Sequence, residues 1–224
     1  MDSRPPFATG EQRLRLLYRL PLSDGDNRIL VVGSGADADS VFDPTVSQAK
    51  VDVIAPGNPL VASGFDVVAL PGCLTRGGEA HSAPVPPERL LELAFSALRP
   101  GGLVVGHLDH LLSVHGLRRM RQGPFAIGTW FRCRGLVSGR KCREALVQAG
   151  FAELDCFYVE PRIEAPMALI PVHPQAATRH FLSAIRRTRG QYSALGFGLR
   201  MALARARLGG ILQPHLLFWA RRPC

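Results

Sequence analysis

The sequence predicts an α/β fold in which a doubly wound, mostly parallel sheet carries an antiparallel strand at its edge. Short apolar runs at residues 29–32 and 103–105 are typical of strands buried on both faces of a parallel sheet. A helical pattern at residues 88–98 precedes the second of these runs, and strands that alternate with helices favour a doubly wound sheet. Two strand-like runs near the C-terminus, at residues 152–159 and 215–220, lack a clear crossover helix beside the sheet. These two late runs predict the antiparallel edge.

The remaining elements follow from periodicity and from turn residues. Residues 51–54 and 66–70 are two more short candidate strands. Residues 140–148 have the spacing of a helix, and Gly150 suits a left-handed position just beyond its end. Near the N-terminus, residues 11–18 predict a short helix with its leucines and tyrosine on one face.

Length and composition indicate a globular protein with one substantial core. The chain has 224 residues, of which 46% are hydrophobic and 20% charged, which excludes a disordered chain. Its five cysteines are scattered and form no Cys-x-x-Cys pair, which argues against a disulfide framework or a zinc cluster. The first residues lack the pattern of a signal peptide, and no uncharged run reaches the ~20 residues that a membrane-spanning helix needs. We therefore expect a cytoplasmic protein.

The chain is basic, with a formal net charge of +9 and a pI of about 10.2. Nearly all of the positive charge is arginine, since lysine occurs only at Lys50 and Lys141. A basic balance is compatible with nucleic acid, anionic lipid or an acidic partner. It is equally compatible with a compositional bias toward arginine that has no bearing on partners.

The sequence pattern divides the chain into two regions. We expect residues 1–27 to form an N-terminal arm and helix, and residues 28–224 to form the α/β domain. A helical basic insertion at residues 165–210 interrupts the last two strands. This insertion is a lid or partner surface in the first interpretation, an anionic-membrane surface in the second, and an RNA-binding surface in the third. Aromatic residues between the arginines are few, which places nucleic acid last.

A glycine-containing turn follows the first strand and predicts a ligand-binding loop. Gly33, Ser34 and Gly35 come directly after the apolar run, and glycine lets the backbone turn sharply and approach a ligand closely. In an open α/β sheet, ligands bind beyond the carboxyl ends of the strands. The Gly-x-Gly pattern lacks the third glycine of the dinucleotide-binding fingerprint, and this absence argues against NAD as the ligand.

Three segments together resemble the class I S-adenosylmethionine (SAM) dependent methyltransferases, as a divergent member with a Rossmann-like sheet. They are the strand and loop at residues 29–37, the strand at 65–70, and the Arg-Pro-Gly-Gly turn at 99–102; the tail at 218–223 also fits. The resemblance implies SAM as cofactor and a methyltransferase activity. It places Gly33, Ser34, Gly35 and Asp37 near the methionine part and ribose of SAM, and Leu70, Pro71 and Gly72 along the methyl-transfer cleft.

The chain departs from the family pattern around the cofactor. Val31 stands where the family usually has an acidic residue, and Asp37 replaces its third loop glycine. Ala55 and Pro56 stand where a carboxylate normally accepts hydrogen bonds from the ribose, with Asp43 or Asp52 as substitutes if the segment is compressed. Only about ten residues separate this point from the next strand, which is too few for a full strand–helix–strand unit.

Polar residues after the strand at 103–105 are the catalytic candidates. In the family this region faces the transferred methyl group, so His107, Asp109 and His110 are expected on the substrate side. A histidine there suits the role of general base near neutral pH. The His-x-Asp-His spacing also resembles part of a metal site, although polar loop residues without a chemical role explain it more simply, and no metal is expected.

Three functional hypotheses result. The first is SAM-dependent methyl transfer to a small-molecule or lipid-linked acceptor. The second is a non-catalytic methyltransferase-like subunit that binds a protein partner through its basic insertion, as the missing carboxylates suggest. The third is an RNA methyltransferase, for which nucleic-acid binding would have to be shown.

Overall fold

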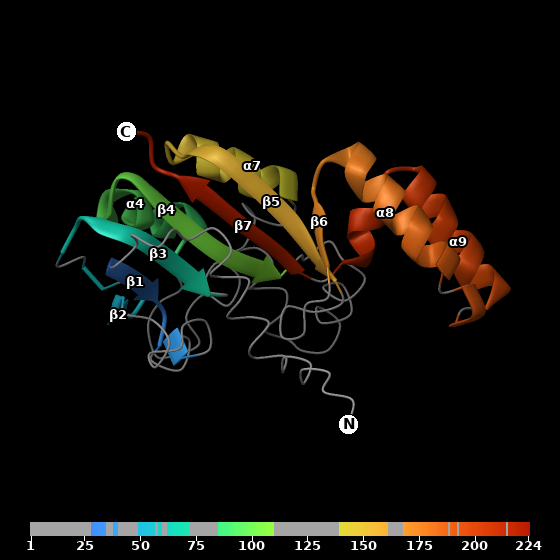
Figure 1. Cartoon of the computed structure of the whole chain (residues 1–224), viewed down its shortest axis with the longest axis horizontal. Helices are drawn as coiled ribbons and strands as arrows, with labels where there is room; N and C mark the ends of the chain where they lie inside the picture. The colour runs from blue at the N-terminus through green and yellow to red at the C-terminus, as the bar shows by residue number, and fades with distance from the viewer. Residues whose placement is uncertain are drawn as a thin grey trace, which may run out of the picture.

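The computed structural model describes the sheet, the helices that cover one of its faces and a helical hairpin at one edge (Figure 1). The described residues are 28–34, 38–39, 49–56, 58–59, 62–71, 85–109, 139–160, 168–187, 189–191, 193–213 and 215–224. The predicted arm and helix at residues 1–27 lie outside this part of the chain.

Seven strands form one sheet in the order β2-β1-β3-β4-β7-β5-β6. The strands are β1 (Arg28–Val32), β2 (Lys50–Ile54), β3 (Phe65–Pro71), β4 (Leu98–Asp109), β5 (Ala152–Glu160), β6 (Ala168–Pro171) and β7 (His215–Arg221). The strands β2, β1, β3 and β4 are parallel to one another, while β7 is antiparallel to both of its neighbours and β6 is antiparallel to β5. The doubly wound, mostly parallel sheet with an antiparallel edge strand is therefore confirmed, and the edge strand is β6.

The C-terminal strand was expected to resemble an edge strand, and this expectation is wrong. The strand β7 lies between β4 and β5, where its Leu216, Leu217, Phe218 and Ala220 are almost fully buried. A strand covered on both faces must carry apolar side chains on both, which explains the unbroken apolar run.

Alternate residues along the strands supply two cores, one on each face of the sheet. On one face, Leu30, Val68 and Val104 pack with the helices α4 (Pro87–Ala97) and α7 (Gly139–Gln148). On the other face, Val31, Ala69 and Val105 form a separate cluster together with Leu217 and Val159.

The strand β4 is longer than the sequence indicated because the Arg-Pro-Gly-Gly turn belongs to it. The helix α4 ends at Ala97, and β4 begins at the next residue instead of after Gly102. Gly101 has φ +75, a left-handed conformation that glycine adopts without a Cβ clash. It gives the strand an irregular start before regular pairing begins at Leu103.

A network of polar contacts stabilises the end of the sheet at which the parallel strands begin. Asp66 accepts a hydrogen bond of 2.8 Å from the backbone nitrogen of Arg28 and forms an ion pair with Arg99. Arg222 donates to the carbonyl oxygens of Phe95 (2.9 Å) and Leu98 (2.6 Å), at the end of α4. The Phe-Asp-Val-Val and Arg-Arg-Pro segments thus hold strands and helix together at the end of the sheet where the parallel strands begin.

The insertion forms a helical hairpin beyond the β6 edge of the sheet (Figure 1). It consists of α8 (Pro174–Arg187), the short helix η1 (Arg189–Gln191), α9 (Ala194–Arg205) and the short helix η2 (Gly209–Leu212). A Cβ at Gly210 would overlap the hydroxyl of Tyr158, and one at Gly209 would overlap the ring of Phe181. The two glycines therefore let η2 approach both β5 and α8 closely. Residues 165–167, 188 and 192 of this segment lie outside the described part of the chain.

Candidate functional site

The carboxyl ends of β1, β3 and β4 lie side by side, so they bring together the residues that follow or end these strands. Backbone pairing places Val31 beside Ala69 and, further along the sheet, Pro71 beside His107. Three of the residues proposed from the sequence, Leu70, Pro71 and His107, are therefore neighbours across β3 and β4. Leu70 is fully buried and His107 is half-buried.

The loop after β1 begins where the sequence placed it. The backbone nitrogen of Gly33 donates to the carbonyl oxygen of Ile54 (2.8 Å), which extends the β1–β2 ladder by one residue. The backbone nitrogen of Ala38 then donates to the carbonyl oxygen of Ser34 (3.1 Å), a spacing of four residues that starts a helical turn. Ser34 is exposed at the start of this turn, where helix N-termini favour negative or electron-rich ligand groups.

No described residue supplies a carboxylate at the end of β2. The strand ends at Ile54, and the residues after it, Ala55 and Pro56, have no side-chain hydrogen-bond acceptor. Asp52 lies two residues before the end of the strand, 3.9 Å from the ammonium of Lys50. Asp52 therefore lies within β2 and not at its carboxyl end. Asp43 lies outside the described residues.

The catalytic candidates lie within β4, whereas the sequence placed them in a loop after the strand. His107 follows Leu103 and Val105 at alternating positions, so it faces the same side of the sheet as these two residues. The backbone of Asp109 also belongs to β4, at the last position of the strand. The strand continues because β7 pairs with it along its whole regular length, down to His215.

His215 is a candidate that the sequence analysis missed. It is the backbone partner of Asp109 in the antiparallel pair, and Leu217, two residues later, is the partner of His107. His215 is 7% exposed and therefore almost fully buried. Residues at diagonal positions of an antiparallel pair lie about 7–8 Å apart, so His107 and His215 are close neighbours on one face. Only the pairing register could reveal this, because the two histidines come from strands far apart in the sequence.

The remaining proposed site residues cannot be placed. Gly35, Asp37, Gly72 and His110 lie outside the described residues. Within the described ranges, no group of three or more His, Cys, Asp or Glu side chains could hold a metal ion. In the same ranges, no helix has the length and apolar character needed to span a bilayer.

Residues near the carboxyl end of β5 contact the first helix of the hairpin. The imidazole Nε2 of His180 lies 2.9 Å from Glu160 Oε2. The ring of Tyr158 packs against Phe181 with 6.1 Å between centroids, and burial raises the pKa of the Tyr158 hydroxyl. Tyr158 and Glu160 thus both contact α8.

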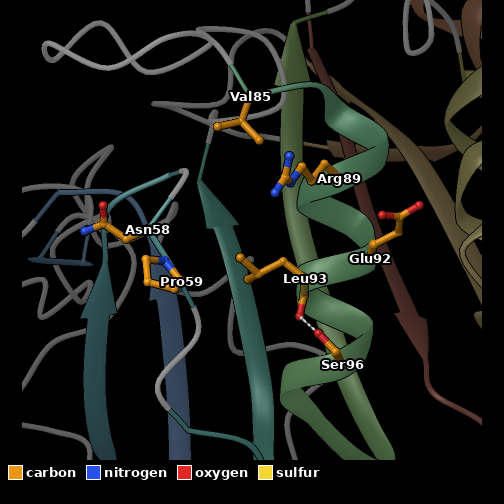
Figure 2. A pocket seen from close by; sticks show the side chains of 7 residues that line it. All are labelled: Asn58, Pro59, Val85, Arg89, Glu92, Leu93 and Ser96. Carbon is orange, nitrogen blue, oxygen red and sulfur yellow. Dashed lines mark hydrogen bonds between the residues drawn. The ribbon is translucent and has the colours of Figure 1, made fainter.

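A groove of about 520 Å³ lies on the other face of the sheet, along α4. Figure 2 shows Leu93 pointing from α4 toward Pro59, with Arg89 and Glu92 on the helix and Asn58 on the opposite wall. The groove exists because the connection from β2 to β3, residues 55–64, is too short to include a crossover helix that would cover this flank. It is separate from His107, which faces the opposite side of the sheet.

Comparison with known proteins gives a fold and no close relative. No protein-family model matches the chain, and no curated protein matches its sequence. Among solved structures, a SAM-dependent methyltransferase of Thermotoga maritima is 12% identical, with a TM-score of 0.54 over 95% of this chain and 88% of that one. The [4+2]-cyclase SpnF is 18% identical, with a TM-score of 0.52 over 99% and 85%.

A larger enzyme shares the same fold. Phosphoethanolamine N-methyltransferase 2 of Haemonchus contortus, solved with phosphomonomethylethanolamine and S-adenosylhomocysteine, is 14% identical with a TM-score of 0.50. The match covers 95% of this chain and 52% of that protein, so the chain spans about half its length. The chain therefore has the Rossmann-like fold of the class I SAM-dependent methyltransferases, at an identity that marks it as divergent.

Proposed function

We propose that the protein transfers the methyl group of SAM to a small-molecule or lipid-linked acceptor. The observation that carries the proposal is the meeting of three strand ends: the turn at Gly33 and Ser34, the end of β3 at Pro71, and His107 on β4. Ligands of open α/β sheets bind at this edge. Solved proteins of the same fold contain SAM or S-adenosylhomocysteine, as in the Haemonchus contortus enzyme.

The described residues fit the cofactor in part. Gly33 and Ser34 would hold its amino-acid and ribose side through backbone groups, since the chain turns there into a helical start. Ala55 and Pro56, directly after β2, have no side-chain acceptor for the ribose, so one hydrogen bond worth roughly 1.5–3 kcal/mol would be missing there. Such a loss weakens binding by about one to two decades, which leaves micromolar affinity within reach. When bound, SAM supplies an electrophilic methyl group to the acceptor.

On the acceptor side, the candidates are the histidines of β4 and β7. His107 and His215 face the same side of the sheet, near the position of Asp109. An imidazole there would accept the proton that an oxygen or nitrogen nucleophile loses as it is methylated. Methyl transfer can also proceed through positioning of the two reactants, so substitution of one histidine is expected to lower the rate without abolishing it. His110 remains a candidate for the same side.

Calorimetry with SAM and with S-adenosylhomocysteine tests the cofactor step. We expect micromolar binding to the wild type and at least about tenfold weaker binding to Gly33→Val, because a branched side chain keeps the ligand from the backbone. Gly190→Val is the matched control, since a Cβ at Gly190 meets nothing within 4 Å. No heat at millimolar ligand, from a protein shown to be folded by circular dichroism, would exclude the proposal.

The second candidate function is a non-catalytic subunit that binds a partner through the hairpin. The absence of a carboxylate among the described residues directly after β2 favours it. The fold alone does not fix the reaction, as the cyclase of the same fold illustrates. Absence of SAM binding together with retained folding is the result expected for this subunit. An RNA methyltransferase is the third candidate, and it requires RNA binding that falls steeply with added salt.

A further inference from the structure

The helix α9 is apolar on the side that faces solvent as well as on the side that is buried. Met201 and Ala204 are buried against α8. On the opposite side, Leu195 is 84% exposed and Leu199 is 61% exposed. Gly198 and Ala202 are also exposed and lie at the same helical spacing as these leucines, so the four residues form one apolar stripe. A helix that is apolar all round normally has both sides covered.

The neighbouring helix shows that this pattern is not a general property of the hairpin. In α8, Phe181 and Ile185 are buried, while Arg179, Arg186 and Arg187 are exposed. This is the ordinary division of a surface helix into an apolar side and a polar side. Of the two helices, α9 is the one that presents leucines to solvent, and no described residue of this chain covers its stripe.

Charge identifies the chemistry of an occupant that would cover this stripe. Residues 174–212, which form the hairpin, contain seven arginines and no lysine, aspartate or glutamate, so this segment carries +7 of the chain's net charge of +9. The arginines lie at both ends of the apolar stripe, with Arg189 before α9, at the hairpin turn, and Arg205 and Arg207 after it. All three are exposed. A partner that matches this surface therefore has an apolar centre with anionic groups around it.

Three kinds of occupant can be compared on this basis. A second copy of the chain would place two arginine-rich surfaces against each other, which like-charge repulsion disfavours. A nucleic acid would satisfy the arginines but would leave Leu195 and Leu199 exposed or poorly packed. A bilayer with anionic lipids satisfies both, because leucines enter the acyl boundary while arginines remain at the phosphates. We propose that the α8–α9 hairpin docks on an anionic membrane surface through this stripe and its flanking arginines.

The hairpin is well placed for such docking. In Figure 1 it projects beyond the β6 edge, and α9 is its outer helix. Three contacts fix it to β5 and to itself: the His180–Glu160 pair and the close approach of Gly209 and Gly210 to α8 and β5. Docking would therefore orient the whole sheet with respect to the membrane. The proposal goes beyond methyl transfer and does not depend on it.

Vesicle sedimentation tests the proposal with the full chain. We expect binding to vesicles in which about a third of the phosphatidylcholine is replaced by phosphatidylglycerol, and little binding to phosphatidylcholine alone. Leu195→Gln/Leu199→Gln should weaken binding at least about tenfold, since two leucines leave the acyl boundary. The matched control is Val53→Gln/Val147→Gln, at valines that are 46% and 55% exposed elsewhere on the sheet and on α7.

A second pair of variants tests the charges. Arg205→Gln/Arg207→Gln, at two of the flanking arginines, should weaken binding about 25-fold, at about fivefold for each arginine near an anionic surface. The control Arg89→Gln/Arg143→Gln, at exposed arginines on α4 and α7, should change it about twofold or less.

Other outcomes overturn the proposal. Absence of vesicle binding does so, as does binding that needs the arginines and not the leucines, which would indicate a purely electrostatic partner such as nucleic acid. Dimerisation on gel filtration that Leu195→Gln/Leu199→Gln abolishes would assign the stripe to a second copy. Calorimetry with SAM on the leucine variant separates this proposal from the proposed function, because cofactor binding should remain unchanged.

Discussion

Replacement of Arg222 by alanine should destabilise the protein by about 2–3 kcal/mol. The guanidinium donates to two carbonyl oxygens at the end of α4, those of Phe95 (2.9 Å) and Leu98 (2.6 Å). It also lies over the Phe95 ring, 4.7 Å from the centroid. Hydrogen bonds from a charged group contribute about 1.5–3 kcal/mol each when buried. We reduce this to about 1 kcal/mol each for a half-buried side chain, and add about 0.5–1 kcal/mol for the cation–π contact.

Urea unfolding followed by circular dichroism measures this loss without any ligand. Arg221→Ala is the matched control, since Arg221 has a longer hydrogen bond to the Gly101 carbonyl (3.1 Å) and an exposed ion pair with Glu153 at 3.5 Å. We expect the control to lose about 1 kcal/mol or less. Arg222→Lys should fall between the two, because lysine keeps the charge but not the forked donor geometry. If Arg222→Ala and Arg221→Ala lose the same free energy of unfolding, the proposed capping of α4 is wrong.

Three further perturbations probe other parts of the structure. Gly106→Ala should cost about 1–3 kcal/mol in urea unfolding, because its Cβ would lie 2.7 Å from Phe218 Cζ; an unchanged midpoint would contradict this packing. Burial raises the pKa of Tyr158, so the phenol stays neutral in the folded state, whereas it ionises near pH ~10 in the unfolded state. The free energy of unfolding should therefore fall above that pH, and it should fall less in Tyr158→Phe. Alkylation resolved by mass spectrometry should modify the exposed Cys224 before Cys142, which should react only on unfolding, because a hydrogen bond to Cys156 and burial raise the Cys142 pKa; equal rates would refute this.

Six of the seven strands could be located from the sequence, and the central ones were clear because they are buried on both faces. The strand β6 was not located, since it lies in the segment that was expected to be a helical insertion. Unbroken apolar runs such as those in β1 and β7 leave few alternatives to a central strand. The start of β4 could not be located in the same way, since Arg99, Pro100 and Gly101 indicate a turn by composition. Pairing with β3 and with the chain after β7 overrides this local preference, as the hydrogen bond from the Gly101 nitrogen to the Arg222 carbonyl shows.

The candidate site could be proposed from the sequence where it depends on strand order and not where it depends on register. The family resemblance assigned Gly33, Pro71 and His107 to it, and the rule that ligands bind beyond the carboxyl ends of the strands explains why these residues lie together. His215 does not, since it begins a strand that runs in the opposite direction and enters the site from the other end of the chain. The wrong expectation that the last strand resembles an edge strand concealed it, because only a strand between β4 and β5 brings its first residue beside Asp109.

Two of the segments that carried the family resemblance, residues 99–102 and 218–223, lie at the end of the sheet opposite the candidate site. Gly101 and Gly102 exchange backbone hydrogen bonds with Arg222 at the amino edge, which continues the β4–β7 ladder beyond Leu103 and Arg221. Because side chains alternate between the two faces, a slip of one residue would turn a strand's inward residues to the opposite face. The Arg-Pro-Gly-Gly and Arg-Arg-Pro segments therefore lengthen the ladder whose register keeps His107 and His215 on one face.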